Sequence, residues 1–174
     1  MKFTIFQASR QGGRKNNEDR VAYSYSRDAL LMVVADGMGG HLHGEIAAQI
    51  AVQTLTDYFQ KLSQPRLADP LAFHSDTITR AHYAINDYAV EQDLLEIPHT
   101  TVVAAIVQDN TAYWAHVGDS RLYLFSDGSL IARTEDHTAV AQLVRDGLIT
   151  EEEAGHHPER NKVSNCLGGY VVPQ

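Results

Sequence analysis

The chain has 174 residues, of which 44% are hydrophobic and one is a cysteine, so it can bury the core of one compact domain and cannot form an intramolecular disulfide. Its formal net charge of -8 argues against a general nucleic-acid binder, which needs clustered Lys and Arg side chains. From this length and composition we expect a single domain over residues 1–174. The chain contains no apolar run near the roughly 18 residues of a membrane span and no signal-peptide core. We therefore expect a reducing cytoplasm and no membrane partner.

The order of strand-like and helical patterns predicts an α+β fold. Apolar runs predict strands at residues 2–7, 21–26 and 30–35, and helical spacing of apolar residues predicts two long helices, from residue 44 to 62 and from 78 to 89. Closely spaced runs with short polar turns then predict an antiparallel meander with strands at 101–108, 112–117, 121–125 and 130–134. Strands followed by two helices and further strands indicate a layered α+β domain rather than a parallel βαβ sheet.

The most informative segment is Asp36-Gly37-Met38-Gly39-Gly40, which directly follows the apolar run 30–35. A buried strand that ends in an acid and a glycine turn brings one carboxylate and one free backbone carbonyl to the rim of a sheet, where a hard metal ion can bind. The same residues can also be a simple tight turn, because Asp and Gly are common in turns. Glu18 and Asp19, at the entry of the strand 21–26, place two further acids at a strand end.

Further short motifs accompany this segment, in the order Arg14-x-x-x-Glu18-Asp19, Gly118-Asp119-Ser120-Arg121, Asp136-His137-Thr138, Pro158-Glu159-Arg160-Asn161 and Leu167-Gly168-Gly169. Each motif is weak alone, but their order and spacing cover nearly the whole length. With them, the chain resembles the metal-dependent protein Ser/Thr phosphatases, the PPM or protein phosphatase 2C family, and within it the bacterial branch. The resemblance implies an antiparallel β-sandwich flanked by helices, with residues 138–169 as a mobile flap beside the active site.

The resemblance also implies the metal ligands Glu18, Asp19, Asp36, Gly37 and Asp119. In this picture Asp36 bridges two Mn²⁺ or Mg²⁺ ions, Asp119 binds a third ion, and Arg14 grips the phosphate. Such oxygen ligands suit these hard ions rather than Zn²⁺. Two ions that share a water can lower its pKa and present it for in-line attack on phosphorus, so no nucleophilic side chain is required.

The family pattern continues, after the flap, into strands that carry two further metal-binding acids, and no equivalent follows in this sequence. We therefore expect a fold that is C-terminally incomplete and has an exposed sheet edge. The candidates for this edge are residues 101–117. Such an edge favours association or lowers stability. The predicted function is metal-dependent hydrolysis of phosphoserine and phosphothreonine in proteins, with a cognate Ser/Thr kinase as a further partner. Two alternatives stay open: a phosphoprotein-binding or regulatory module without turnover, and a segment that works only when paired with its missing part.

Several side chains also have a purely structural interpretation. Arg14 can be a solvated loop arginine, and Asp119 can shape a turn between strands. Asp136 and His137 are expected to be the N-cap and first turn of a helix rather than catalytic groups. A zinc site built from His41, His43, His156 and His157 is disfavoured because their spacing is not compact. Cys166 lacks the following arginine of a tyrosine-phosphatase loop and is expected to be an apolar filler.

Overall fold

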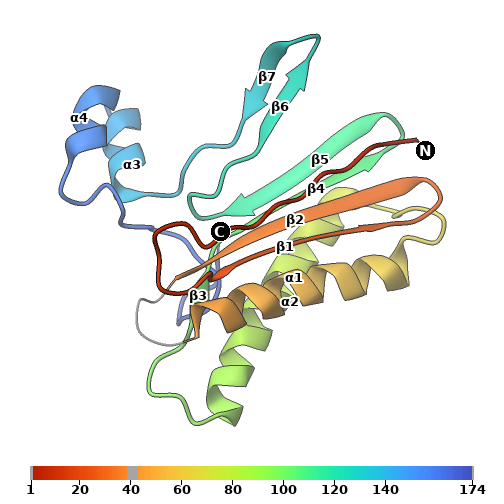
Figure 1. The fold of residues 1–174 in the computed structure, drawn as a ribbon, viewed down its shortest axis with the longest axis horizontal. Coiled ribbons are helices and arrows are strands. Elements are labelled where there is room, and N and C mark those ends of the chain that lie inside the picture. The colour runs from red at the N-terminus through yellow and green to blue at the C-terminus, as the bar shows by residue number, and fades with distance from the viewer. Residues whose placement is uncertain (1, 39–42, 174) are drawn as a thin grey trace.

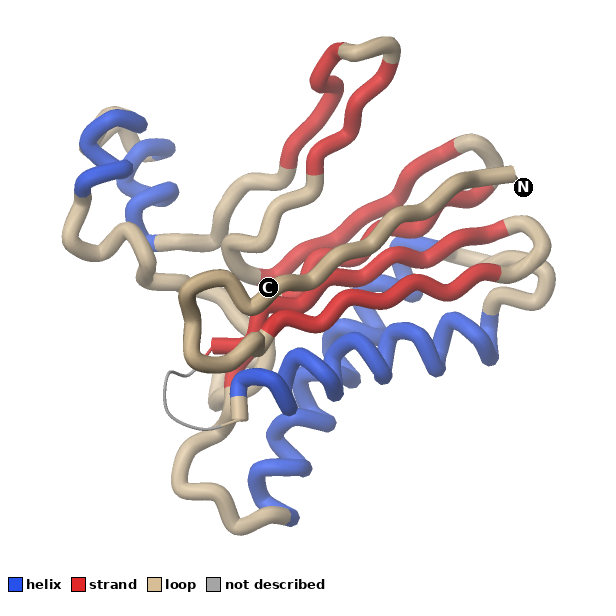
Figure 2. The backbone as a smooth tube through the Cα atoms, in the orientation of Figure 1, coloured by secondary structure: helices blue, strands red, loops and turns tan. Residues whose placement is uncertain are grey.

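The computed structural model describes residues 2–38 and 43–173. The strands are β1 (Asp19–Tyr25), β2 (Ala29–Met38), β3 (His99–Thr100), β4 (Val102–Gln108), β5 (Thr111–Val117), β6 (Tyr123–Ser126) and β7 (Ser129–Arg133). The helices are α1 (Gly44–Leu62), α2 (Pro70–Glu91), α3 (Ala139–Arg145) and α4 (Glu151–His156). From residue 19 onward the strands and the two long helices follow one another in the predicted order, and Figures 1 and 2 show both long helices on one face of the main sheet. The α+β class is therefore confirmed.

The main sheet is antiparallel, with the strand order β1-β2-β4-β5 and β3 paired to β2. Residues 101–117, the candidates for an exposed edge, contain β4 and β5. Strand β4 is interior, and β5 lies at an edge of the sheet. Strands β6 and β7 form a separate two-stranded sheet, so the predicted meander breaks after β5. The break has a local cause: the Gly118 carbonyl accepts from the His137 backbone N–H at 3.0 Å, and the Gly118 N–H donates to His137 Nδ1 at 3.3 Å. This segment thus bonds to the residues before α3 instead of to a neighbouring strand.

The predicted strand at residues 2–7 is wrong. This segment has no strand assignment, and Figure 1 shows it running across the sheet face that is turned away from α1 and α2. Alternation of apolar residues suits a strand, but a strand also needs a neighbouring backbone to pair with. Because the segment lies over a face of the sheet and not beside an edge, no described backbone is placed to pair with it.

The core lies between the inner face of the sheet and the two long helices. Helix α1 buries residues at helical spacing, which include Ala48, Val52, Leu55 and Phe59. Helix α2 begins earlier than predicted because the Asp69 side chain accepts hydrogen bonds from two backbone N–H groups of its first turn, at 3.0 Å each. Each large side chain that becomes fully buried in this core contributes about 1.5–3 kcal/mol.

The residues after β7 form the two short helices α3 and α4. The N-cap of α3 is Thr138, whose side chain accepts from the Ala141 N–H at 3.2 Å, so the expectation that Asp136 is the cap is wrong. Asp136 instead accepts two hydrogen bonds from Arg121, at 2.7 and 2.6 Å. An isolated β-bridge joins Thr138 to Val163. Whether residues 138–169 move as a flap stays a prediction.

None of the helices formed by the described residues is both long enough and apolar enough to cross a membrane. The cytoplasmic location stays a prediction.

Candidate active site

Asp19 and Asp36 lie directly opposite each other on the neighbouring strands β1 and β2. Successive side chains of a strand point to opposite faces, so Asp36 shares its face with Val34 and Asp19 shares its face with Val21. This is the outer face of the sheet, where Val34 is 42% exposed, while the alternate residue Val33 is buried on the helix side. The register of two strands therefore brings both carboxylates together on the open face.

The backbone of Asp36 is held by a buried pair of threonines in the adjacent chain segment. The Asp36 N–H donates to Thr101 Oγ1 at 3.1 Å, and the Asp36 carbonyl accepts from the Thr101 N–H at 2.9 Å and from Thr100 Oγ1 at 3.0 Å. Thr100 and Thr101 are fully buried. Their hydrogen bonds satisfy the polar backbone at the point where β2 reaches the rim, and so position the Asp36 side chain.

Asp119 approaches the same place from the end of β5. Its neighbour Ser120 forms a hydrogen bond between Ser120 Oγ and Thr101 Oγ1, at 2.6 Å, so the turn that carries Asp119 is tied to the residue that orients Asp36. The negative charge of Asp119 is close enough to act on the Asp36 carboxyl. Asp19 and Asp36 are thus directly paired, and the charge of Asp119 acts on Asp36 from a third strand end.

The gathering of these acids changes the chemistry of Asp36. Although this residue is exposed as a whole, the surrounding protein limits the hydration of its carboxyl group. This desolvation, followed by the charge and hydrogen bond of Asp19 and the charge of Asp119, raises the pKa of Asp36 to about 6, and Arg14 opposes the rise. A divalent cation would relieve this repulsion between carboxylates.

Glu18 sits where β2 passes the beginning of α1. The Gly37 N–H donates to the Glu18 carbonyl at 3.3 Å. A Cβ atom on Gly37 would collide with the backbone of Gly44, and a Cβ atom on Gly44 would collide with Glu18 Oε2. The two glycines therefore allow the close crossing that brings the Glu18 carboxylate beside α1 and next to the Gly37 backbone.

Arg14 lies in the exposed loop before β1. Its backbone is held by Gln11, whose side-chain Nε2 donates to the Arg14 carbonyl at 2.8 Å. The guanidinium is the positive charge that acts on the carboxyl of Asp36. The structure therefore brings Arg14 within electrostatic range of the acids, and its contact with a phosphate stays a prediction.

The donor set fits a divalent metal ion in type but not in number. Across residues 2–38 and 43–173, no group of three or more His, Cys, Asp or Glu side chains is arranged to hold a metal ion. The chemistry of the donors nonetheless fits Mn²⁺ or Mg²⁺, because all are oxygens, and because desolvation and then the charge of Asp19 raise the pKa of Asp36 in the absence of a cation. The site thus has the right ligand type and too few ligands in place. Gly39, Gly40 and His41 of the neighbouring segment lie outside the described residues.

Sequence reasoning missed the residues that support the acids. Thr100, Thr101 and Ser120 hold the Asp36 backbone and the Asp119 turn, and Gly44 makes room for Glu18. One signal was available, since two threonines directly before the apolar run 102–107 are polar residues at the start of a buried strand.

A cavity of about 450 Å³ lies beside Asp119, between the base of the β6–β7 hairpin and the helices α3 and α4. Its lining includes four arginines, which are Arg121, Arg133, Arg145 and Arg160. Arg121 is paired with Asp136, and Arg145 lies 3.5 Å from Glu135. The cavity is a recess next to Asp119 with a mixed polar and apolar lining.

The fold and the carboxylates define a class of α+β proteins with an oxygen-ligand site at the end of an antiparallel sheet. The family described as protein phosphatase 2C matches residues 7–163, and the chain belongs to this family. A serine/threonine phosphatase, stp, from Listeria monocytogenes is 36% identical over 165 residues, which cover 94% of this chain and 66% of that protein. PstP from Mycobacterium tuberculosis is 39% identical over 160 residues, which cover 91% of this chain and 30% of that protein.

Solved structures agree with this assignment. Stp1 from Staphylococcus aureus has a TM-score of 0.85 at 31% identity, and the match covers 97% of this chain and 66% of that chain. The catalytic domain of PstP, crystallised with two manganese ions, has a TM-score of 0.74 at 35% identity, with 92% of this chain and 65% of that chain covered. The chain thus spans just under two thirds of the length of these structures.

Proposed function

We propose that this chain carries the metal-binding half of a protein phosphatase site, which hydrolyses phosphoserine and phosphothreonine with the help of Mn²⁺ or Mg²⁺. The observation that carries the proposal is the direct pairing of Asp19 with Asp36 on one open face, with the charges of Asp119 and Arg14 acting on the Asp36 carboxyl. The two manganese ions bound by the related PstP domain support the choice of cofactor.

The chain's own residues divide the work of holding metal and phosphate. In a site with its full ligand set, Asp36, the Gly37 carbonyl and Glu18 would contribute ligands to two ions, Asp19 would support them, and Asp119 would contribute to a third. When bound, the ions supply an acidified water as the nucleophile and neutralise charge that develops on the phosphoryl oxygens. The Arg14 guanidinium would bind two phosphate oxygens in its planar fork and orient the phosphorus for in-line attack.

The substrate would be a phosphorylated protein, made by a cognate Ser/Thr kinase. The cavity beside Asp119 offers room for the residues that flank the phosphorylated side chain, because it opens next to Asp119 and its lining includes charged side chains of both signs. Its arginines and acids are of both signs, so it favours polar over apolar flanking residues.

A second function is favoured by a specific observation. Among the described residues, no group of three or more His, Cys, Asp or Glu side chains is arranged to hold a metal ion, and of the acids only Asp19 and Asp36 are directly paired. A phosphoprotein-binding or regulatory module that keeps the fold without turnover would have these features. A segment that becomes active only when paired with the remaining part would have them too.

Calorimetric titration with Mn²⁺ tests the proposed site. We expect the 174-residue chain to bind at most one Mn²⁺ tightly, to lose this binding in Asp36→Asn, and to keep it in the control Asp87→Asn, which changes an exposed acid of α2. Equal Mn²⁺ affinity in the wild type and Asp36→Asn would remove Asp36 from the site.

A further inference from the structure

The turn that carries Asp119 is held on its near side by His137. The Gly118 N–H donates to His137 Nδ1 at 3.3 Å, and the Gly118 carbonyl accepts from the His137 N–H at 3.0 Å. Both backbone groups of the residue before Asp119 are thus bonded to one residue. Gly118 also approaches Thr101 so closely that a Cβ atom on it would lie 2.6 Å from Thr101 Cγ2. Gly118 is therefore enclosed between His137 and Thr101, and it cannot shift without moving one of them.

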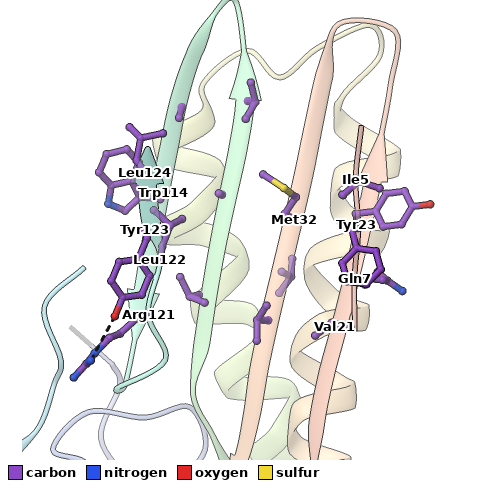
Figure 3. A pocket seen from close by; sticks show the side chains of 18 of the residues that line it. Ile5, Gln7, Val21, Tyr23, Met32, Trp114, Arg121, Leu122, Tyr123 and Leu124 are labelled. Atoms are coloured by element: carbon purple, nitrogen blue, oxygen red, sulfur yellow. Dashed lines mark hydrogen bonds between the residues drawn. The ribbon is translucent and has the colours of Figure 1, made fainter. Parts of the chain in front are cut away.

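Asp136 holds the same turn on its far side. Arg121, two residues after Asp119, donates two hydrogen bonds to the Asp136 carboxylate, at 2.7 and 2.6 Å. Arg121 Nη1 also lies 3.5 Å from the Tyr123 hydroxyl, the contact drawn as a dashed line in Figure 3. The consecutive residues Asp136 and His137 therefore bracket Asp119.

His137 also joins the two ends of the segment that contains α3 and α4, residues 138–163. The Ser164 N–H donates to the His137 carbonyl at 2.8 Å, and Asn165 Nδ2 lies 3.2 Å from His137 Nδ1. An isolated β-bridge joins the first and last residues of the segment. The chain before the segment and the chain after it thus meet at His137, which is bonded to the end of β5 as well.

The hydrogen bond from Gly118 determines the tautomer of His137. A backbone N–H can only donate, so Nδ1 must accept and the ring proton lies on Nε2. The amide group of Asn165 then donates to the same Nδ1, and the two distances are similar, 3.3 Å from Gly118 and 3.2 Å from Asn165. A single acceptor atom therefore binds both the turn of Asp119 and the chain beyond the segment.

His137 has the neutral form that this bonding requires. Desolvation, followed by the charges of His116 and Arg145, lowers the pKa of His137 below its ordinary value, and the charge of Asp136 opposes this shift. The His116 ring stacks on the His137 ring, with the centroids 4.4 Å apart. The His137 ring thus offers two features, an acceptor atom and a stacking surface, which substitutions can separate.

We propose that His137 is a positioning residue that clamps the turn of Asp119 to both ends of the segment 138–163 through its Nδ1 atom. It is not a catalytic residue, because it acts only by fixing the backbone from which the Asp119 side chain extends. That this side chain holds an ion rests on the proposed function, whereas the clamp rests on the hydrogen bonds of His137. Because coupling between two parts is reciprocal, loosening the turn also loosens the segment, and the reverse.

Three substitutions separate the acceptor atom from the ring. His137→Asn places Oδ1 where Nδ1 was, so it keeps the acceptor without the ring. His137→Phe keeps a ring that can stack on His116 and has no acceptor. His137→Gln carries its polar group one bond further from the backbone, and it serves as a second variant without an acceptor at the δ position.

Amide hydrogen exchange of the metal-free 174-residue chain, measured by NMR in EDTA, reports on both sides of the clamp. We expect the Gly118 and Ser164 amides to exchange about tenfold faster in His137→Phe and His137→Gln, because each variant lacks one hydrogen bond of ordinary strength. His137→Asn should stay close to the wild type at both amides. The Ile106 amide, in the interior strand β4, should exchange slowly in every variant, which shows that the fold is intact.

The matched control is His157→Phe, which removes another histidine Nδ1, an acceptor for the Glu159 N–H at 3.1 Å in the loop after α4. It should leave the Gly118 and Ser164 amides unchanged. Protection of Gly118 that survives in both His137→Phe and His137→Gln would overturn the proposal. Exchange in His137→Asn as fast as in His137→Gln would also overturn it, because the ring would then be the feature that matters. Faster exchange at Gly118 with unchanged Ser164 would overturn the clamp, since His137 would hold one side only.

Added Mg²⁺ separates the clamp from the proposed function. An ion at Asp119 should slow the exchange of the Gly118 amide further in the wild type and not in Asp119→Asn. If Mg²⁺ has no effect on the wild type while the His137 variants respond as expected, Asp119 holds no ion and the clamp stands. If Mg²⁺ slows the exchange while His137→Phe and His137→Gln keep the Gly118 amide protected, the ion stands and the clamp is overturned.

Discussion

Replacement of Asp36 with asparagine should stabilise the metal-free chain above pH 7. Asparagine keeps the shape of the side chain and removes a negative charge that is disfavoured by desolvation and then by the charges of Asp19 and Asp119. Because the folded pKa of about 6 exceeds the ordinary 3.8, folding favours the protonated acid. The wild type therefore has no penalty below about pH 4, and the penalty grows as the pH rises through 6.

The size of the effect follows from the pKa. A rise from 3.8 to about 6 corresponds to about 3 kcal/mol. The residue is exposed, so solvent screening reduces the expected gain to about 1 kcal/mol. For a chain of this length, that gain raises the Tm by about 2–4 °C.

Thermal denaturation in EDTA at pH 8 and at pH 4, followed by circular dichroism, measures the difference between wild type and Asp36→Asn. We expect a higher Tm for the variant at pH 8 and no gain at pH 4. The control is Asp28→Asn, where a hydrogen bond from Arg27 lowers the pKa of the acid, so the variant should lose stability at pH 8. An equal gain for Asp36→Asn at both pH values would refute the reasoning.

Two further substitutions test the roles of residues around the acids. The first is made in this chain fused to the unmatched part of the Listeria protein. There, Arg14→Ala should lower kcat/KM for a phosphopeptide more than it lowers Mn²⁺ affinity. An unchanged kcat/KM would show that Arg14 is a solvated loop residue. Gly44→Ala should weaken Mn²⁺ binding in calorimetry, since its methyl group displaces the Glu18 carboxylate, whereas Gly155→Ala, where a Cβ atom meets nothing within 4 Å, should not. Equal affinities for these two variants would place Glu18 outside the site.

The order of elements was predictable because each depends on local patterns. The run 30–35 and its glycine turn indicated β2 and the acid at its end, and helical spacing indicated α1 and α2. Segments whose structure depends on distant partners were not predictable. Residues 2–7 alternate like a strand but have no strand partner. Helix α3 is capped by Thr138, while Asp136 accepts hydrogen bonds from Arg121, fifteen positions earlier.

The candidate site divides in the same way. The resemblance to the family implied Glu18, Asp19, Asp36 and Asp119 as site residues, but a resemblance in sequence does not determine which of them meet. The direct pairing of Asp19 with Asp36 depends on the register of β1 and β2, and the turn that carries Asp119 is held by the hydrogen bond between the Ser120 and Thr101 hydroxyls. The open apolar face also depends on the whole sheet, because only the register shows that Met32, Ala105 and Trp114 share one row.

The most direct test of the account is Mn²⁺-dependent release of phosphate from a phosphothreonine peptide. The measurement compares the 174-residue chain with its fusion to the unmatched part of the Listeria protein, each as the wild type and as the Asp36→Asn variant. We predict little or no release by the short chain, and Mn²⁺-dependent turnover by the fusion that falls by several powers of ten in the Asp36→Asn variant. Turnover by the fusion that survives the loss of the Asp36 carboxylate would contradict the account.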